Sequence, residues 1–148
     1  MDFEKLLKKE LSNFYACSKQ VNEFFHKKEL SFLSVNMQET FKEYLNVIIT
    51  CENFVEELLK ERAFNPSNTI DSIIEEITEN HKEIILQQID DEIKSTGYKM
   101  SINRLMGYYQ ANLENIIFLM DEPKVVDELE SQLNELSKIK AIMLPISS

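Results

Sequence analysis

The residues of this 148-residue chain that are best suited to metal chemistry include two histidines, each of which can be tested against known ligand spacings. Helical di-iron sites need Glu-x-x-His on two helices and a glutamate from each of two others. Glu23-x-x-His26 supplies this motif once, but Thr78 stands three residues before His81, so the second copy is missing. We therefore predict no metal site, and we interpret His81 as a core or boundary residue on an apolar stripe.

Clustered carboxylates are a second candidate, at Glu75, Glu76 and Glu79. Carboxylates on one helical turn can hold Mg²⁺ against a triphosphate. The cluster resembles the magnesium-binding helix of all-α nucleotide pyrophosphohydrolases, which also carry Glu-x-x-Asp on the following helix. No Glu in this chain is followed by Asp three residues later. An acidic, solvated start of a helix is the simpler interpretation.

The two cysteines are the remaining candidates for nucleophilic or zinc chemistry. Cys17 and Cys51 both fall in apolar patterns and have no paired neighbour at zinc-ligand spacing. A thiol in an apolar seam is a small buried side chain rather than a low-pKa thiolate. Neither a Gly-rich phosphate loop nor a nucleophile elbow occurs. We expect no enzymatic activity, no cofactor, and reduced thiols.

The amino-acid composition limits the kinds of molecule that this chain is expected to bind. The formal net charge is −10, which repels phosphate backbones and anionic lipid, so we expect neither nucleic acid nor membrane as a partner. The longest apolar run, residues 116–120, is far shorter than a membrane span. Residues 1–10 are charged and contain no apolar signal segment. We therefore expect a cytoplasmic protein with a single domain over residues 1–148.

The elements that must position any site are helices. Between residues 37 and 59, apolar side chains recur at alternating spacings of four and three, which is the seam of a helix that lies along a partner helix. Only two Gly and three Pro interrupt the whole chain. The sequence thus predicts an all-α, up-and-down bundle of about five long antiparallel helices with coiled-coil-like packing.

The helix boundaries follow from caps and breakers. Asp2 is a plausible N-cap for the first helix, Ser67 or Asn68 for the third, and Ser101 for the fourth. Gly97 stands where a glycine commonly ends a helix. The predicted segments are residues 2–28, a bent or continuing helical stretch at 26–36 that packs on the core, 37–62, 68–96, 101–120, and a last helix that opens at 121–123.

The last helix carries the most suggestive surface. Its apolar stripe faces away from a row of acidic residues and is made of Val126, Leu129, Leu133, Leu136 and Met143. The stripe either completes the bundle or belongs to a helix that docks loosely and swings out, offering an apolar groove to an amphipathic helix of a partner.

A family likeness appears in the fourth helix. Residues 110–119, which read QANLENIIFL, resemble the Asn-x-x-Asn signature of FlgN-type flagellar export chaperones. Residues 52–62 are similar to the Glu/Arg-rich end of the second long helix in that family, and the length, acidity and Leu-rich final helix match its outline. Ile116 departs from the pattern, because the family commonly has Gly after the second Asn.

The resemblance implies a cytoplasmic chaperone that keeps hook-junction proteins unpolymerised before export. It implies that the final helices bind the amphipathic C-terminal segment of a client, through the stripe of the last helix (Val126, Leu129, Leu133, Leu136, Met143). Asn112 and Asn115 are the motif residues that the resemblance adds to this set. From the residues alone, the two asparagines bridge helices or cap hydrogen bonds within the bundle.

Three classes of function stay open at this level. The first is a non-enzymatic chaperone or adaptor with a helical protein client. The second is an acidic inhibitor or immunity protein that binds a folded toxin or nuclease mainly by charge, including a nucleic-acid mimic of the phage type. The third is a metal-dependent nucleotide hydrolase. The sequence is compatible with a monomer or a homodimer.

Overall fold

The computed structural model describes residues 1–25, 30–66 and 69–145, and these form five helices and no strand. The helices are α1 (Phe3–Phe25), α2 (Val35–Glu61), α3 (Ser72–Leu86), α4 (Asp91–Leu119) and α5 (Pro123–Met143). The predicted all-α fold with about five helices is therefore confirmed.

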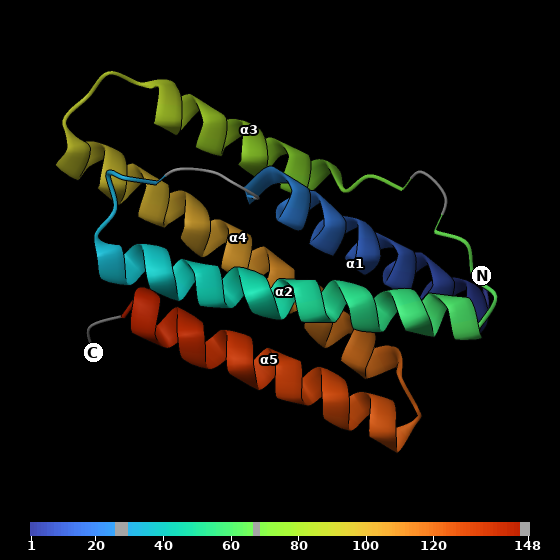
Figure 1. The fold of residues 1–148 in the computed structure, drawn as a ribbon. Helices are drawn as coiled ribbons and strands as arrows, with labels where there is room; N and C mark the ends of the chain where they lie inside the picture. Colours follow the sequence, from blue (N-terminus) through green and yellow to red (C-terminus); the bar gives the residue numbers. More distant parts are fainter. Residues whose placement is uncertain (26–29, 67–68, 146–148) are drawn as a thin grey trace.

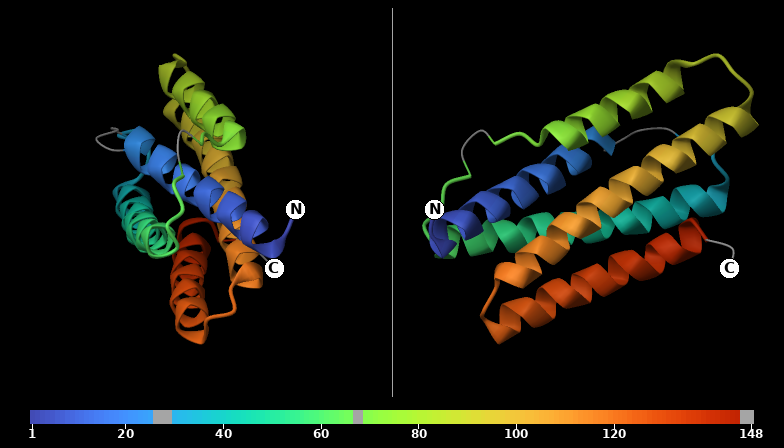
Figure 2. Two further views of the ribbon diagram at one scale, coloured as in Figure 1. Left: turned by 90° about the vertical axis from the view of Figure 1, so that its right-hand side faces the viewer. Right: turned by 180° about the vertical axis from the view of Figure 1, so that it is seen from behind.

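Consecutive helices run in opposite directions (Figure 1), and all consecutive pairs except α2 and α3 pack against each other. α1 contacts α2 and α4, and α5 contacts the same two helices from the other side, so these four helices enclose the core with α2 and α4 on opposite corners. α3 lies outside this group against α1 and α4. The two further views show α3 and α5 on opposite sides of the molecule (Figure 2).

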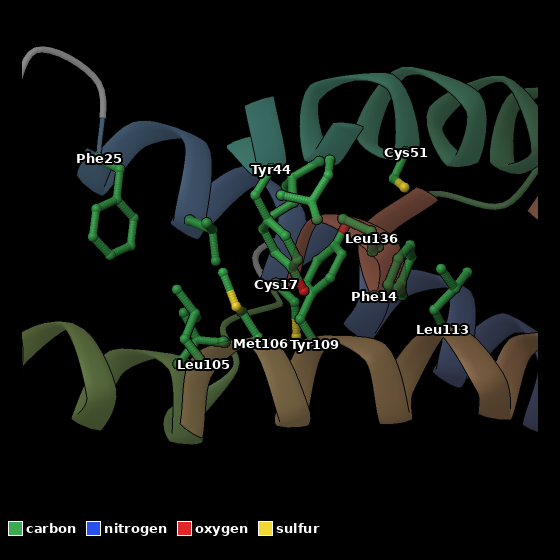
Figure 3. Packing of buried hydrophobic residues seen from close by; sticks show 14 of the residues in the cluster. Phe14, Cys17, Phe25, Tyr44, Cys51, Leu105, Met106, Tyr109, Leu113 and Leu136 are labelled. Atoms are coloured by element: carbon green, nitrogen blue, oxygen red, sulfur yellow. The ribbon is translucent and has the colours of Figure 1, made fainter. Parts of the chain in front are cut away.

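The four-and-three spacing explains why these segments are helices with one buried side. In α2 the predicted seam is buried from Phe41 to Leu58, whereas Met37 at its start is half-buried. Its buried members are Phe41, Tyr44, Ile48, Cys51, Val55 and Leu58. α1 and α4 each bury one side in the same way, and Figure 3 shows Leu105, Met106 and Tyr109 of α4 pointing into the core that these helices share. One apolar cluster joins residues from all five helices.

The start of α1 agrees with the prediction, because Asp2 Oδ1 accepts a hydrogen bond of 2.8 Å from Lys5 N. α1 ends at Phe25, and the predicted continuation over residues 26–28 lies outside the described residues. Residues 30–34 are not helical, which corrects the predicted helical stretch there. Leu30 and Leu33 are nevertheless buried, so this connection packs on the core as expected.

The third and fourth helices differ most from the prediction. α3 starts after Asp71, whose Oδ1 accepts from Ile74 N at 2.9 Å, and the candidate caps at residues 67 and 68 lie outside the described residues. α3 ends at Leu86 rather than near Gly97, and α4 begins at Asp91. Gly97 and Ser101 therefore lie inside α4.

The break between α3 and α4 has a local cause. Asp90 Oδ1 accepts from Glu92 N at 2.8 Å, and two acidic residues in the first turn of α4 favour the positive end of its dipole. The prediction was wrong because Ile89 and Ile93 continue the apolar spacing of α3. Both side chains are exposed in the structure, so their spacing does not report a buried stripe.

Candidate functional site

The stripe proposed to bind a client faces the inside of the bundle. Leu129, Leu136 and Met143 are buried against α2 and α4, whereas Val126 and Leu133 are half-buried at the edge of the same contact. Figure 3 shows Leu136 reaching the core beside Phe14 and Tyr109. A client could use Leu129, Leu136 and Met143 only if α5 leaves its place.

The attachment of α5 has few polar contacts. Its N-cap, Glu122, makes no side-chain capping bond and instead forms an ion pair with Arg62 at the end of α2. In the middle of the helix, Gln110 of α4 donates to Ser137 Oγ at 3.1 Å. The apolar contact therefore supplies most of the docking energy of α5.

A buried glutamine interrupts that apolar contact. Gln132 is 5 % exposed and occupies a core position between Leu129 and Leu136. Its Nε2 donates to Glu128 at 3.1 Å, but its Oε1 is buried with no hydrogen-bond partner within the described part of the chain. An unpaired buried acceptor costs about 1–3 kcal/mol. Sequence reasoning missed Gln132, although its position seven residues before Ile139 places it in the same seam.

The two asparagines of the resemblance occupy different environments. Asn112 is buried, and its Nδ2 donates to the Tyr108 carbonyl within α4 at 2.9 Å. Asn115 is exposed and lines a polar groove of about 690 Å³ beside Lys8 and Lys9 of α1. Neither asparagine lies on α5, so the structure does not gather the motif and the α5 stripe into one continuous surface.

Asp71 organises the polar floor of that groove. Tyr108 donates to Asp71 Oδ2 at 2.6 Å, and Gln20 of α1 pairs with both backbone groups of Asp71, at 2.8 Å and 3.1 Å. Burial by itself raises the pKa of Asp71, but the hydrogen bonds from Tyr108 and Ile74 N outweigh it and hold the pKa below its ordinary value. The ionised carboxylate thus ties α3 to α1 and α4.

His81 is a core residue, as predicted, with an exposed fraction of 0 %. Its Nδ1 lies 2.9 Å from the Ile77 carbonyl oxygen and 2.9 Å from Ser101 Oγ. A carbonyl oxygen only accepts, so Nδ1 carries the proton and Nε2 is the unprotonated nitrogen. The Phe25 and Tyr98 rings stand edge-on to the imidazole, with centroids at 5.1 and 4.6 Å.

The His81 environment is suited to structure rather than to acid–base chemistry. Nε2 and the Tyr98 hydroxyl are both buried without a hydrogen-bond partner in the part of the chain that the structure describes. Burial lowers the pKa of His81 to about 4, so the imidazole is neutral at pH 7. A group shielded from solvent in this way has no route to a substrate.

The other residues considered for metal or nucleophilic chemistry are the carboxylates of α3, His26 and the two cysteines. Glu75, Glu76 and Glu79 lie on α3, and no group of three or more metal-binding side chains occurs among the described residues. His26 lies outside those residues. Cys17 and Cys51 are buried, and burial raises both thiol pKa values, that of Cys51 to about 12, so each stays an unreactive thiol near neutral pH.

A second recess lies between α1 and α2. It measures about 500 Å³, and its floor is made of Phe25, Leu30, Phe41, Leu45 and Ile49. Ile49 is 47 % exposed, so the recess opens to solvent along the outer side of α2. The lining also includes the polar or charged side chains of Asn22, Gln38, Glu39, Lys42 and Asn46.

Comparisons with protein-family models, curated proteins and solved structures return no match to this chain. Among the helices that the structure describes, none combines the length and the apolar character required to cross a lipid bilayer.

Proposed function

We propose that this chain is a non-enzymatic, protein-binding bundle of the chaperone or adaptor kind, and that an amphipathic helix of its client takes the place of α5 between α2 and α4. The observation that carries the proposal is the contact of α5 itself. A single apolar stripe holds the last helix on two neighbours, and the unpaired Gln132 Oε1 weakens that stripe at its centre.

The energetics set a condition on such a client. Fully burying one leucine contributes about 1.5–3 kcal/mol, and α5 buries Leu129 and Leu136 completely, with Ile139 and Met143 almost so. Release of α5 therefore costs several kcal/mol, and only a helix with an equivalent stripe recovers that cost. The groove thus favours partners that present apolar residues at the spacing of α5.

A labelled peptide of residues 122–145 tests this exchange, because it carries the stripe of α5 itself. We expect the peptide to bind the full chain, as measured by fluorescence anisotropy. Leu136→Ala, which loosens the resident helix, should increase binding at least tenfold. Gln132→Leu removes the unpaired acceptor and should reduce binding at least tenfold by tightening α5.

The matched control is Leu11→Ala in α1, because Leu11 is as fully buried as Leu136 but does not belong to α5. Its loss of stability should leave peptide binding close to that of the unmodified chain. Equal binding by the Leu136→Ala and Gln132→Leu variants, or no binding by either, would rule out exchange of α5.

The flagellar hook-junction client implied by the resemblance is the specific form of this proposal. The alternative, an acidic inhibitor of a folded toxin or nuclease, is supported by the outward face of α5, where Asp127, Glu130 and Glu135 line a shallow depression. Affinity that depends on such charges falls steeply as salt rises, because ions screen exposed charges beyond about 10 Å at 0.1 M.

Capture of partners from the native cell extract distinguishes these functions. We expect the immobilised chain to retain a filament-type protein through a helical terminal segment after a wash in high salt. The Gln132→Leu variant should retain less of it. Retention of a nuclease or toxin that a high-salt wash removes would instead establish the inhibitor function.

A further inference from the structure

The outward face of α4 carries a seam of exposed residues that nothing in the described chain covers. α4 turns Leu105, Tyr109 and Leu113 into the core, and its opposite side is exposed. On that side the spacing of four and three recurs from Met100 to Phe118 over about 27 Å. The exposed seam consists of Met100, Arg104, Gly107, Ala111, Glu114 and Phe118, which we call the α4 seam.

The α4 seam has an exposed large apolar side chain at each end. Met100 is 53 % exposed and Phe118 is 77 % exposed. α4 lies on the near side of the molecule in the right-hand view of Figure 2, in front of α2. The outward face of α5, by contrast, presents Asp127, Glu130 and Glu135 to solvent.

The α4 seam is complementary to the α4 seam of a second copy that runs in the opposite direction. When two copies of α4 lie antiparallel with Tyr109 at the centre, Met100 meets Phe118 of the other copy, and Arg104 meets Glu114. Gly107 meets Ala111 in the same register. Each contact occurs twice, as a two-fold interface requires. A parallel pair would set Arg104 against Arg104 and Glu114 against Glu114, which is repulsive.

Arg104 shares the groove between α3 and α4 with the carboxylates of Glu76, Glu79 and Glu83, but it forms no ion pair with them. Neither Arg104 nor Glu114 forms an ion pair with another described residue. The seam is flanked by the exposed, uncharged side chains of Asn103 and Asn115. The net charge of −10 opposes association in general.

The glycines provide an independent observation. The chain contains two glycines, Gly97 and Gly107, and both lie inside α4 with ordinary negative φ angles. A Cβ placed on either would meet nothing within 4 Å, so no contact within the chain requires a glycine there. Glycine inside a helix costs about 1 kcal/mol relative to alanine. At Gly107, in the middle of the seam, close approach of a second helix backbone explains that cost.

We propose that the α4 seam is the interface with a second copy of this chain, in an antiparallel, two-fold dimer. Gly107 and Ala111 form its closely packed centre, the Arg104–Glu114 pairs set its direction, and Met100 with Phe118 closes each end. The interface uses the side of α4 that faces away from the core, so it is independent of the exchange of α5.

Sedimentation equilibrium of the full chain and of charge variants tests this arrangement. We expect the unmodified chain to dimerise, and Arg104→Glu or Glu114→Arg alone to weaken dimerisation at least tenfold, because each variant sets like charges opposite one another twice. An equimolar mixture of the two variants should recover a heterodimer, and the double variant R104E/E114R should recover the homodimer. Both Arg104 and Glu114 are exposed, so these substitutions should leave the fold of the monomer intact.

A second variant separates the interface from folding. Gly107→Leu fills open space on the monomer and improves helix propensity, so it should raise the melting temperature at high dilution while abolishing the dimer. Asn134→Leu, on the exposed face of α5, is the matched control and should leave the dimer intact. A monomeric unmodified chain at millimolar concentration, or a dimer that survives Gly107→Leu, would overturn the proposal.

Discussion

Leu129→Asp is expected to abolish folding, or to lower the free energy of unfolding by more than about 4 kcal/mol, because it sets an unpaired carboxylate in the core. Leu129 is 0 % exposed and packs between α2 and α4. The substitution removes the apolar contact of a whole leucine side chain and introduces a charge at a site shielded from water. Urea unfolding followed by circular dichroism at 222 nm measures the loss.

Leu133→Asp is the matched control for that prediction. The two leucines lie one helical turn apart on α5, but Leu133 is half-buried. The carboxylate of an aspartate at position 133 can therefore reach water. We expect Leu133→Asp to lower the free energy of unfolding by on the order of 1 kcal/mol, which is within the range of ordinary point substitutions. Similar, small losses for both variants would show that α5 spends most of its time away from the bundle.

This comparison also bears on the proposed exchange. A helix that is docked at rest and released only for a client should show the large, position-dependent losses of a core element. Leu129→Asp would then damage the resting fold and client binding together. For this reason the Gln132→Leu and Leu136→Ala variants, which change docking without adding charge, are better suited to measuring the exchange itself.

Acid should destabilise the protein through His81. Its pKa is about 4 in the folded chain, against an ordinary value of about 6.5 when unfolded. At a pH between these two values, the His81 imidazole is therefore protonated in the unfolded chain and neutral in the folded chain. Stability from His81 is complete above pH 6.5 and is lost as the pH falls to 4. At about 1.4 kcal/mol per pKa unit, the loss amounts to about 3 kcal/mol.

His81→Asn isolates this contribution. Asn Nδ2 can still donate to the Ile77 carbonyl oxygen, but the side chain does not titrate. We expect the variant to be less stable than the unmodified chain at pH 7, because it leaves space beside Phe25 and Tyr98. The difference between the two chains should shrink by about 3 kcal/mol as the pH falls from 7 to 4.

Urea unfolding at a series of pH values measures that difference, and the carboxylates that titrate over the same range affect both chains alike. Equal slopes against pH for the two chains would mean that His81 is solvated or paired with an acceptor in solution. The same series on Ser101→Ala, which keeps the imidazole but removes its hydroxyl neighbour, should retain the slope of the unmodified chain.

The burial of α1, α2 and the second half of α4 could be predicted from the sequence with little ambiguity. Each carries an unbroken seam of apolar residues at one helical spacing, and burying that face is the dominant favourable term available to it. The start of α5 at Pro123 and the burial of His81 followed from equally local information, a proline at a first helical turn and a histidine on an isoleucine stripe.

The boundary between α3 and α4 could not be predicted in this way. Ile89 and Ile93 extend the spacing of α3, and nothing nearby distinguishes an apolar residue that will be buried from one that will not. α4 poses the same difficulty around its circumference, because it carries Leu105 on one side and Met100 on the other. Only its position against α1, α3 and α5 decides that Leu105 is inside.

The candidate site, too, could be predicted only in part from the sequence. The α5 stripe could be predicted from the sequence, but whether it is a core contact or an exposed surface depends on how α5 packs against α2 and α4. The pairs Asp71–Tyr108 and His81–Ser101, separated by 37 and 20 residues, likewise depend on how α3 lies across α1 and α4. Local spacing determined which residues are apolar on which face of each helix. Tertiary packing alone decided which faces meet, because that choice depends on contacts between segments far apart in the chain.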